Sequence, residues 1–184
     1  STEDFIEAIE RLNAESILLF PNNKNIILAA EQAAELIENK TVIVVPTLSV
    51  PQGVSALINY NDQATAEENA ETMIEAIEQV RTGQITYAVR DTVIEDKEIK
   101  KGDILGMIDG KIEHVAKEIQ AGAKGLIDLM LEAGAEVLSI FYGDAVTEEE
   151  AAELLDYVAE KYPDVESEVQ FGGQPIYGYV LSVE

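Results

Sequence analysis

The chain has 184 residues, a hydrophobic fraction of 47% and a formal net charge of −24, from 12 basic and 36 acidic residues. This length fits one domain or two small lobes, and the apolar content suffices for a packed core, which excludes a disordered chain. So acidic a chain repels nucleic-acid phosphates and anionic lipid, and we therefore expect it to bind neither. Solubility, or steering of a basic protein partner, accounts for the charge.

Cysteine is absent, and His114 is the only histidine. Disulfides and thiolate metal sites are excluded, and we expect His114 to be a packed or surface residue without a catalytic role. No run approaches the roughly 18 apolar residues of a membrane helix, and no signal peptide opens the sequence. We expect a cytoplasmic protein. Since Ser1 and Thr2 are already placed to cap a helix, we also expect a domain of a longer protein.

The first part of the chain has the pattern of a βαβ unit. Two apolar runs, residues 16–20 and 41–45, read as strands, and residues 25–39 between them have helical spacing. Continuous apolar strands of this kind favour a parallel sheet. Further helices are expected at residues 4–13, at residues 51–58, and at residues 66–80, the last with a capping box of Thr65 and Glu68.

The pattern changes after Gly83, which we expect to end a helix. Residues 84–94 alternate as a strand, and turns at Gly102-Asp103 and Asp109-Gly110 predict short antiparallel strands. Helical spacing returns at residues 115–133. The remaining expected elements are a strand at 136–141, a helix from the cap Thr147 to Tyr162, and strands at 166–171 and 176–183.

These elements predict an α/β fold with two βαβ-type lobes and a central antiparallel β meander. The expected parts are residues 1–82, 83–114 and 115–184. Both lobes have the order helix, strand, turn, helix, strand, and Ala14-Glu15 matches Ala135-Glu136 at the start of corresponding strands. An internal duplication would explain this shared order.

The turn after the first strand is the sharpest candidate for a site. It contains Asn22, Asn23, Lys24 and Asn25. Asparagine caps helices and accepts left-handed backbone, so a capped turn that Asn25 alone could complete is one interpretation. The other is a carboxylate or phosphate site made of the amides, the lysine and the free N–H groups of the helix.

The turn after the second strand carries Thr47, Ser49, Gln52 and Gly53. Parallel strands end at the same edge of a sheet, so these groups should meet the asparagine turn in one cleft. A proline-stiffened connection is the alternative.

Arg90, Asp91 and Thr92 place a positive charge in a very acidic chain. We expect an ion pair of Arg90 with a carboxylate, or else an arginine that anchors a protein partner. The turn Gly172-Gly173-Gln174-Pro175 lacks the spacing of phosphate-binding loops and reads as a connection between strands.

Four stretches, in this order, resemble one family: FPNNKNIILAAEQAAEL, VVPTLSVPQGVSAL, GQITYAVRDT and KKGDILGMIDGKI. With the ending GGQPIYGYVLSVE, they resemble the C-terminal domain of the bacterial fatty acid kinase A-type protein, known as the FakA or YloV-like group. This group is related to dihydroxyacetone kinase and was long labelled as such, or as a Dak phosphatase family. The resemblance covers essentially the whole chain.

The resemblance implies a parent protein in three parts. An N-terminal domain binds ATP and magnesium, a middle domain has a metal site that includes cysteine, and the C-terminal domain engages a fatty-acid-binding B-type subunit. The acyl carboxylate that this partner presents is phosphorylated, and acyl phosphate feeds phospholipid synthesis. The present chain resembles only the third part, so the resemblance implies no catalytic residue, metal or cofactor of its own.

Three functions therefore stay open. The first is a docking domain for the B-type subunit. The second is a small-ligand or catalytic domain that acts on a phosphorylated or carboxylated metabolite at the asparagine turn. The third is a structural domain or a homodimer. Titration against an acyl-loaded B-type subunit and turnover of a phosphorylated substrate would separate them.

Overall fold

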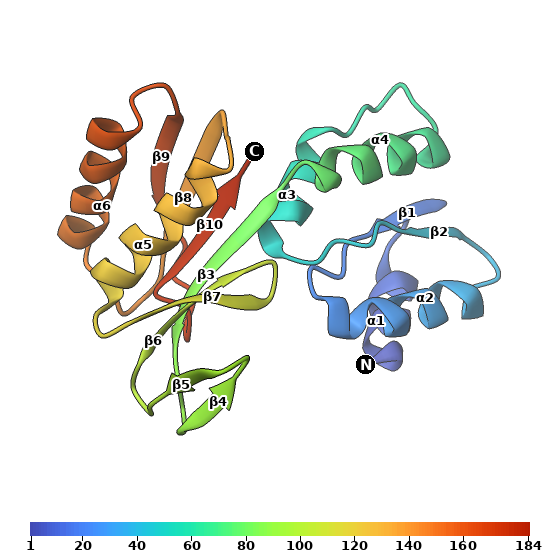
Figure 1. The fold of residues 1–184 in the computed structure, drawn as a ribbon. Coiled ribbons are helices and arrows are strands. Elements are labelled where there is room, and N and C mark those ends of the chain that lie inside the picture. The colour runs from blue at the N-terminus through green and yellow to red at the C-terminus, as the bar shows by residue number, and fades with distance from the viewer. The chain divides into compact units, whose positions relative to one another are not determined.

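A computed structural model describes all residues, Ser1–Glu184. It divides into two units, Ser1–Val80 and Arg81–Glu184 (Figure 1). The α/β class predicted from the sequence is confirmed. No helix has both the length and the apolar composition needed to cross a bilayer.

The first unit contains the predicted βαβ arrangement. Strands β1 and β2 pair in parallel, with Ser16 opposite Thr41 and Leu19 opposite Val44. Two small apolar clusters form its core, one around Ile9, Ile17 and Ala33 and the other around Val45, Met73 and Ile77. Its elements are α1 (Thr2–Arg11), β1 (Ser16–Leu19), the 3₁₀ turn η1 (Lys24–Ile26), α2 (Ile27–Leu36), β2 (Thr41–Val44), α3 (Val50–Ile58) and α4 (Ala66–Glu78).

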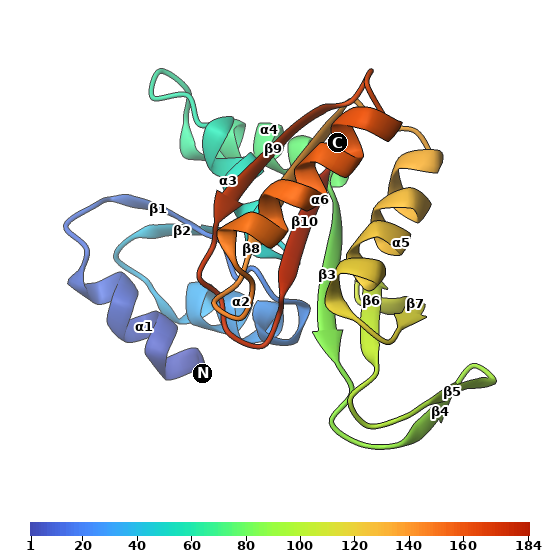
Figure 2. The same ribbon diagram turned by 90° about the vertical axis from the view of Figure 1, so that its left-hand side faces the viewer.

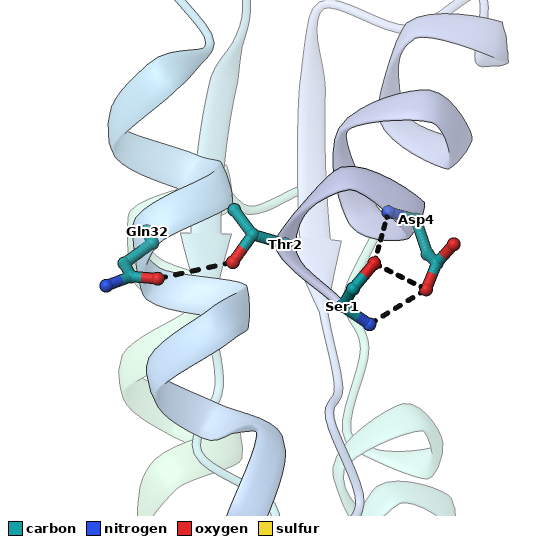
Figure 3. A network of polar contacts seen from close by, with 4 residues as sticks. All are labelled: Ser1, Thr2, Asp4 and Gln32. Atoms are coloured by element: carbon teal, nitrogen blue, oxygen red, sulfur yellow. Dashed lines mark hydrogen bonds and ion pairs between the residues drawn. The ribbon is translucent and has the colours of Figure 1, made fainter.

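Ser1, rather than Thr2, is the N-cap of α1. Its hydroxyl accepts a hydrogen bond from the Asp4 backbone N–H, and the Asp4 carboxylate accepts one from the Ser1 backbone nitrogen (Figure 3). Thr2 instead donates through its hydroxyl to the Gln32 side chain of α2, at 3.2 Å (Figure 3). The cap and this contact fix the start of α1 beside α2.

The second unit is built on a six-stranded mixed sheet with the order β7-β6-β3-β10-β8-β9. β8 and β9 are parallel, which gives a second βαβ arrangement, and the other pairs are antiparallel. Its elements are β3 (Arg81–Tyr87), β4 (Thr92–Ile94), β5 (Lys97–Ile99), β6 (Ile104–Ile108), β7 (Lys111–Ala116), α5 (Ile119–Glu132), β8 (Val137–Tyr142), α6 (Glu148–Lys161), β9 (Glu166–Phe171) and β10 (Tyr179–Val183).

Helices α5 and α6 lie side by side on one face of this sheet (Figure 2). Leu126, Ile127 and Met130 of α5 and Leu154 of α6 are fully buried in one continuous apolar cluster. Of the predicted meander, β3, β6 and β7 belong to this sheet, while β4 and β5 form a separate two-stranded hairpin that extends away from it (Figures 1 and 2).

Several expected element boundaries are wrong. The strand expected at residues 84–94 is two strands, β3 and β4, and the strand expected at 176–183 begins at Tyr179. The helix before Gly83 ends at Glu78, and Gly83 lies inside β3, where an added Cβ would press on Met130 of α5. The helix expected from residue 115 begins at Ile119, because His114 and Val115 still pair with β6. Tertiary packing and strand pairing overrode local helical spacing at both places. The predicted hairpin at Asp109-Gly110 is confirmed, with φ of 49° and 85°.

Candidate functional site

The turns after β1 and β2 meet through Asn22 and Thr47. The Asn22 backbone N–H donates to Thr47 Oγ1 at 2.9 Å, and Thr47 Oγ1 donates to Asn22 Oδ1 at 2.8 Å. Thr47 is fully buried. The parallel pairing of the strands thus brings together the two turns that the sequence placed at one edge of the sheet.

Asn22 has left-handed backbone, with φ of 58°, which asparagine accepts more readily than most residues. Its side chain lies directly against the backbone of Gly53, so closely that a Cβ at residue 53 would overlap Asn22 Oδ1. Gly53 is therefore required by this close approach. The Asn22 Oδ1 atom is occupied by Thr47, and only its Nδ2 group lacks an intramolecular acceptor.

The side-chain amide of Gln52 forms its hydrogen bonds within the first unit. Its Oε1 atom accepts from the Leu48 N–H at 2.7 Å, and its Nε2 group donates to the Ile77 carbonyl at 3.1 Å. Ser49 caps α3 by accepting from the Gln52 N–H at 3.2 Å. Gln52 thus ties the turn after β2 to the end of α4.

Asn23, and not Asn25, is the capping residue of the first turn. Asn23 Oδ1 accepts from the Asn25 N–H at 2.9 Å and begins the 3₁₀ turn η1. α2 then begins at Ile27 without a side-chain cap, so the expectation that Asn25 alone completes the cap is wrong. Because a 3₁₀ turn precedes the α-helix, the capping residue lies two positions before the one expected from the sequence. Lys24 and Asn25 are exposed.

Arg90, Asp91 and Thr92 lie in the second unit, where β3 leads into the β4–β5 hairpin. Arg90 is exposed and makes no ion pair, so the ion pair expected from the sequence is not formed. Asp91 Oδ1 accepts from the Lys101 N–H at 2.8 Å and holds the base of the hairpin, and Thr92 begins β4 opposite Ile99. The Arg90 guanidinium is therefore an exposed positive charge without an intramolecular ion pair.

One side of α3 in the first unit is apolar and exposed. The opposite side of this helix is buried through Pro51, Gln52, Gly53 and Ala56. Five large apolar side chains are exposed by 45% to 78%, and we call them the α3 apolar face: Leu48, Val50, Val54, Leu57 and Ile58. Residues 41–61 contain no charged side chain. Apolar side chains that gather on one exposed face of a helix are typical of interaction surfaces.

Sequence reasoning missed a polar network between α5 and α6. Asp128 accepts hydrogen bonds from Tyr157 and Tyr162, the latter at 2.6 Å, and forms an ion pair with Lys161 at 3.1 Å. Burial raises the pKa of Asp128, but the bonds from these three groups outweigh it and leave the pKa below its usual value. Burial and the Asp128 bond raise the pKa of Tyr162 to about 12.

Asp103 is a second carboxylate that joins elements of this unit, and it is buried. It pairs with the Lys117 ammonium at 2.6 Å and accepts from the Lys100 N–H at 2.9 Å, and these bonds lower its pKa. His114 is half-buried, and its ring lies against Gly125. No three or more carboxylate or imidazole side chains gather where they could hold a metal ion. Asp103 and Asp128 thus join elements of the second unit.

The comparisons with known proteins agree with this architecture. The chain is 42% identical to protein YloV of Bacillus subtilis over 184 residues, and it spans about a third (33%) of the length of that relative. Its fold is similar to the linoleic-acid-loaded fatty acid kinase B3 protein of Streptococcus pneumoniae, with a TM-score of 0.71, 13% identity, and coverage of 100% and 76% of the two chains. It is also similar to the dihydroxyacetone kinase of C. freundii, with a TM-score of 0.65, 14% identity, and coverage of 100% and 41%.

Residues 1–184, the whole chain, match the family model of the fatty acid kinase A-subunit-like (FakA-like) C-terminal domain. The sequence resemblance stated above is thereby confirmed. At 13% and 14% identity, the two solved structures establish the fold alone. The chain belongs to the FakA-like C-terminal domain family.

Proposed function

We propose that this chain is a docking domain through which a fatty acid kinase of the A type engages a fatty-acid-binding B-type subunit. The α3 apolar face is the observation that carries the proposal, because it leaves five large apolar side chains open on and beside one short helix. Docking would place the partner's acyl carboxylate near ATP on another domain of the kinase, for acyl phosphate formation.

The charge distribution supports a protein partner for this face. The chain as a whole carries −24, yet residues 41–61 are free of charge. A partner can therefore bury the α3 apolar face without desolvating a carboxylate, which favours tight packing at the centre of an interface. The surrounding acidic surface speeds association with a partner of positive potential and makes it sensitive to salt.

A small-ligand or catalytic role at the asparagine turn has less support. Asn22, Thr47 and Gln52 already bond to one another or to the backbone, so the turn offers a ligand little beyond Asn22 Nδ2 and the Lys24 ammonium. We expect no turnover of a phosphorylated substrate by this chain, because neither a base nor a nucleophile stands beside these groups.

Titration calorimetry of the chain against an acyl-loaded B-type subunit tests the docking role. We expect micromolar or tighter binding that weakens as salt is raised. Leu57→Glu and Leu57→Lys should both weaken binding at least tenfold, since each puts a charge into an apolar contact. Opposite effects of the two changes would show that charge alone matters there.

Leu36→Glu is the matched control, because Leu36 at the end of α2 is 65% exposed and Leu57 is 62% exposed. It should leave affinity within about twofold. Absence of binding by the unchanged chain, or equal binding by the Leu57 variants and the control, would overturn the proposed function.

A further inference from the structure

The second unit contains a cavity of about 230 Å³ at the point where β3 ends and β6 and α5 begin. Ile85, Ile104 and Ile119 form apolar walls, and Tyr87, Tyr177 and Asp144 add two aromatic rings and a carboxylate. An apolar cavity of about 150 Å³ takes up benzene. This cavity therefore has room for one aromatic ring with a short side chain.

The walls of the cavity are held by hydrogen bonds within the unit. The Gly178 N–H donates to the Ile85 carbonyl at 2.8 Å, and Thr86 Oγ1 donates to the Ile176 carbonyl at 3.1 Å. On the other side, the Asp144 N–H donates to the Gln174 carbonyl at 3.2 Å. A ligand would thus enter a site whose backbone is already ordered, which lowers the entropic cost of binding.

Ile176, which also lines the cavity, has an unusual backbone conformation. Its φ is 73°, a left-handed value that a β-branched side chain rarely adopts. Burial does not compensate for this strain, because the side chain is 66% exposed. Strained residues of this kind concentrate at binding sites. Glycine is the residue best suited to this backbone conformation, but it has no side chain. Isoleucine at this position instead places an apolar side chain at the cavity.

The electrostatics of the cavity favour a cation. The Asp144 carboxylate is exposed and forms no ion pair, whereas the Lys117 ammonium of the same unit is committed to Asp103. The cavity lining therefore carries one free carboxylate, which would repel a carboxylate ligand and attract an ammonium.

We propose that this cavity binds a small primary amine with an aromatic or branched apolar body. The apolar body packs against Ile85, Ile104 and Ile119. The ammonium pairs with the Asp144 carboxylate and lies near the two tyrosines, whose ring faces attract cations. This site uses residues of the second unit only and does not depend on the docking proposal.

Titration of the whole ¹⁵N-labelled chain with three matched probes tests the site. 2-Phenylethylamine is the cationic probe, 2-phenylethanol the neutral one and 3-phenylpropionate the anionic one. We expect the amine to shift the amide signals of Thr86, Ile119 and Gly178, with an affinity at least tenfold above that of the alcohol. Equal binding of the carboxylate, or no shift of these signals at millimolar amine, would overturn the proposal.

Two variants separate charge from shape. Asp144→Asn should remove most of the preference for the amine over the alcohol, while Asp156→Asn, the same change at an exposed carboxylate of α6, should not. Ile176→Gly should weaken the amine and the alcohol alike and leave the chain folded, because glycine accepts this backbone. Amine binding that survives Asp144→Asn unchanged would show nonspecific binding and overturn the site.

Discussion

The two units divide polar and apolar residues differently. In the first unit, the polar residues at the strand ends bond to one another, and large apolar side chains of α3 are exposed. In the second unit, the apolar residues form one continuous core under α5 and α6, and two carboxylates join the elements. A two-stranded sheet buries little apolar surface, whereas a six-stranded sheet with two helices buries its own. The apolar residues of the first unit are thus divided between two small cores and the α3 apolar face.

The largest difference in stability between variants of the two units should come from shortening a leucine side chain. Leu126→Ala in α5 removes a fully buried side chain and should cost about 2–5 kcal/mol of unfolding free energy. Leu57→Ala on the α3 apolar face should change stability by no more than about 0.5 kcal/mol. Urea unfolding followed by circular dichroism measures both, and equal losses would mean that the α3 apolar face is packed rather than open.

The α5–α6 network should show the next largest effect. Asp128→Asn keeps the shape of the side chain but removes the charge that Tyr157, Tyr162 and Lys161 share. Bonds to a charged acceptor are worth about 1.5–3 kcal/mol, so we expect a loss of about 1–3 kcal/mol. Asp156→Asn on the exposed side of α6 serves as the control in the same urea experiment. A loss no greater than the control's would mean that the network does not stabilise the helix pair.

High pH should weaken the second unit through Tyr162. Its pKa is raised to about 12, so the folded unit keeps this hydroxyl protonated where the unfolded chain has lost the proton. The stabilisation is complete below the unfolded pKa of about 10 and is lost as pH rises to about 12. Tyr162→Phe should flatten this part of the stability curve and remove one late step from the tyrosinate absorbance titration. An unchanged curve would mean that Tyr162 ionises alike in both states.

The contact of Asn22 with Gly53 should give the smallest effect. Gly53→Ala would push Asn22 Oδ1 away from Thr47 and should cost about 1 kcal/mol, the worth of one hydrogen bond. Asn22→Gly removes the obstructing side chain, so the double variant should lose less than the sum of the two single variants. Additive losses in thermal unfolding would mean that the two residues do not interact.

The sequence predicted the framework well because strong local signals determine it. Apolar runs at β1 and β2, the Thr65 and Thr147 caps and the Asp109-Gly110 turn all lie where local chemistry decides the structure. Where the residue type depends on a contact with a distant part of the chain, the prediction from the sequence was wrong. Gly83 reads as a helix end, yet it is glycine because Met130 passes over it.

The candidate sites show the same limit. The meeting of Asn22 with Thr47 follows from the geometry of parallel strands and could be expected. The partner of Gln52 could not, because the Ile77 carbonyl that it bonds belongs to the far end of α4. Nor could the exposure of α3 be inferred, since Val54 and Leu57 look like core residues in the sequence. Burial depends on which elements pack together, and that is not a local property.

The position of β10 in the sheet has a consequence for synthesis on the ribosome. β10 is the last element of its unit, yet it lies between β3 and β8 and pairs with both. Until residues 179–183 leave the exit tunnel, the nascent unit consists of two half-sheets with open inner edges. We therefore expect the six-stranded sheet of the second unit to form only after β10 has been synthesised, because β10 joins the two half-sheets.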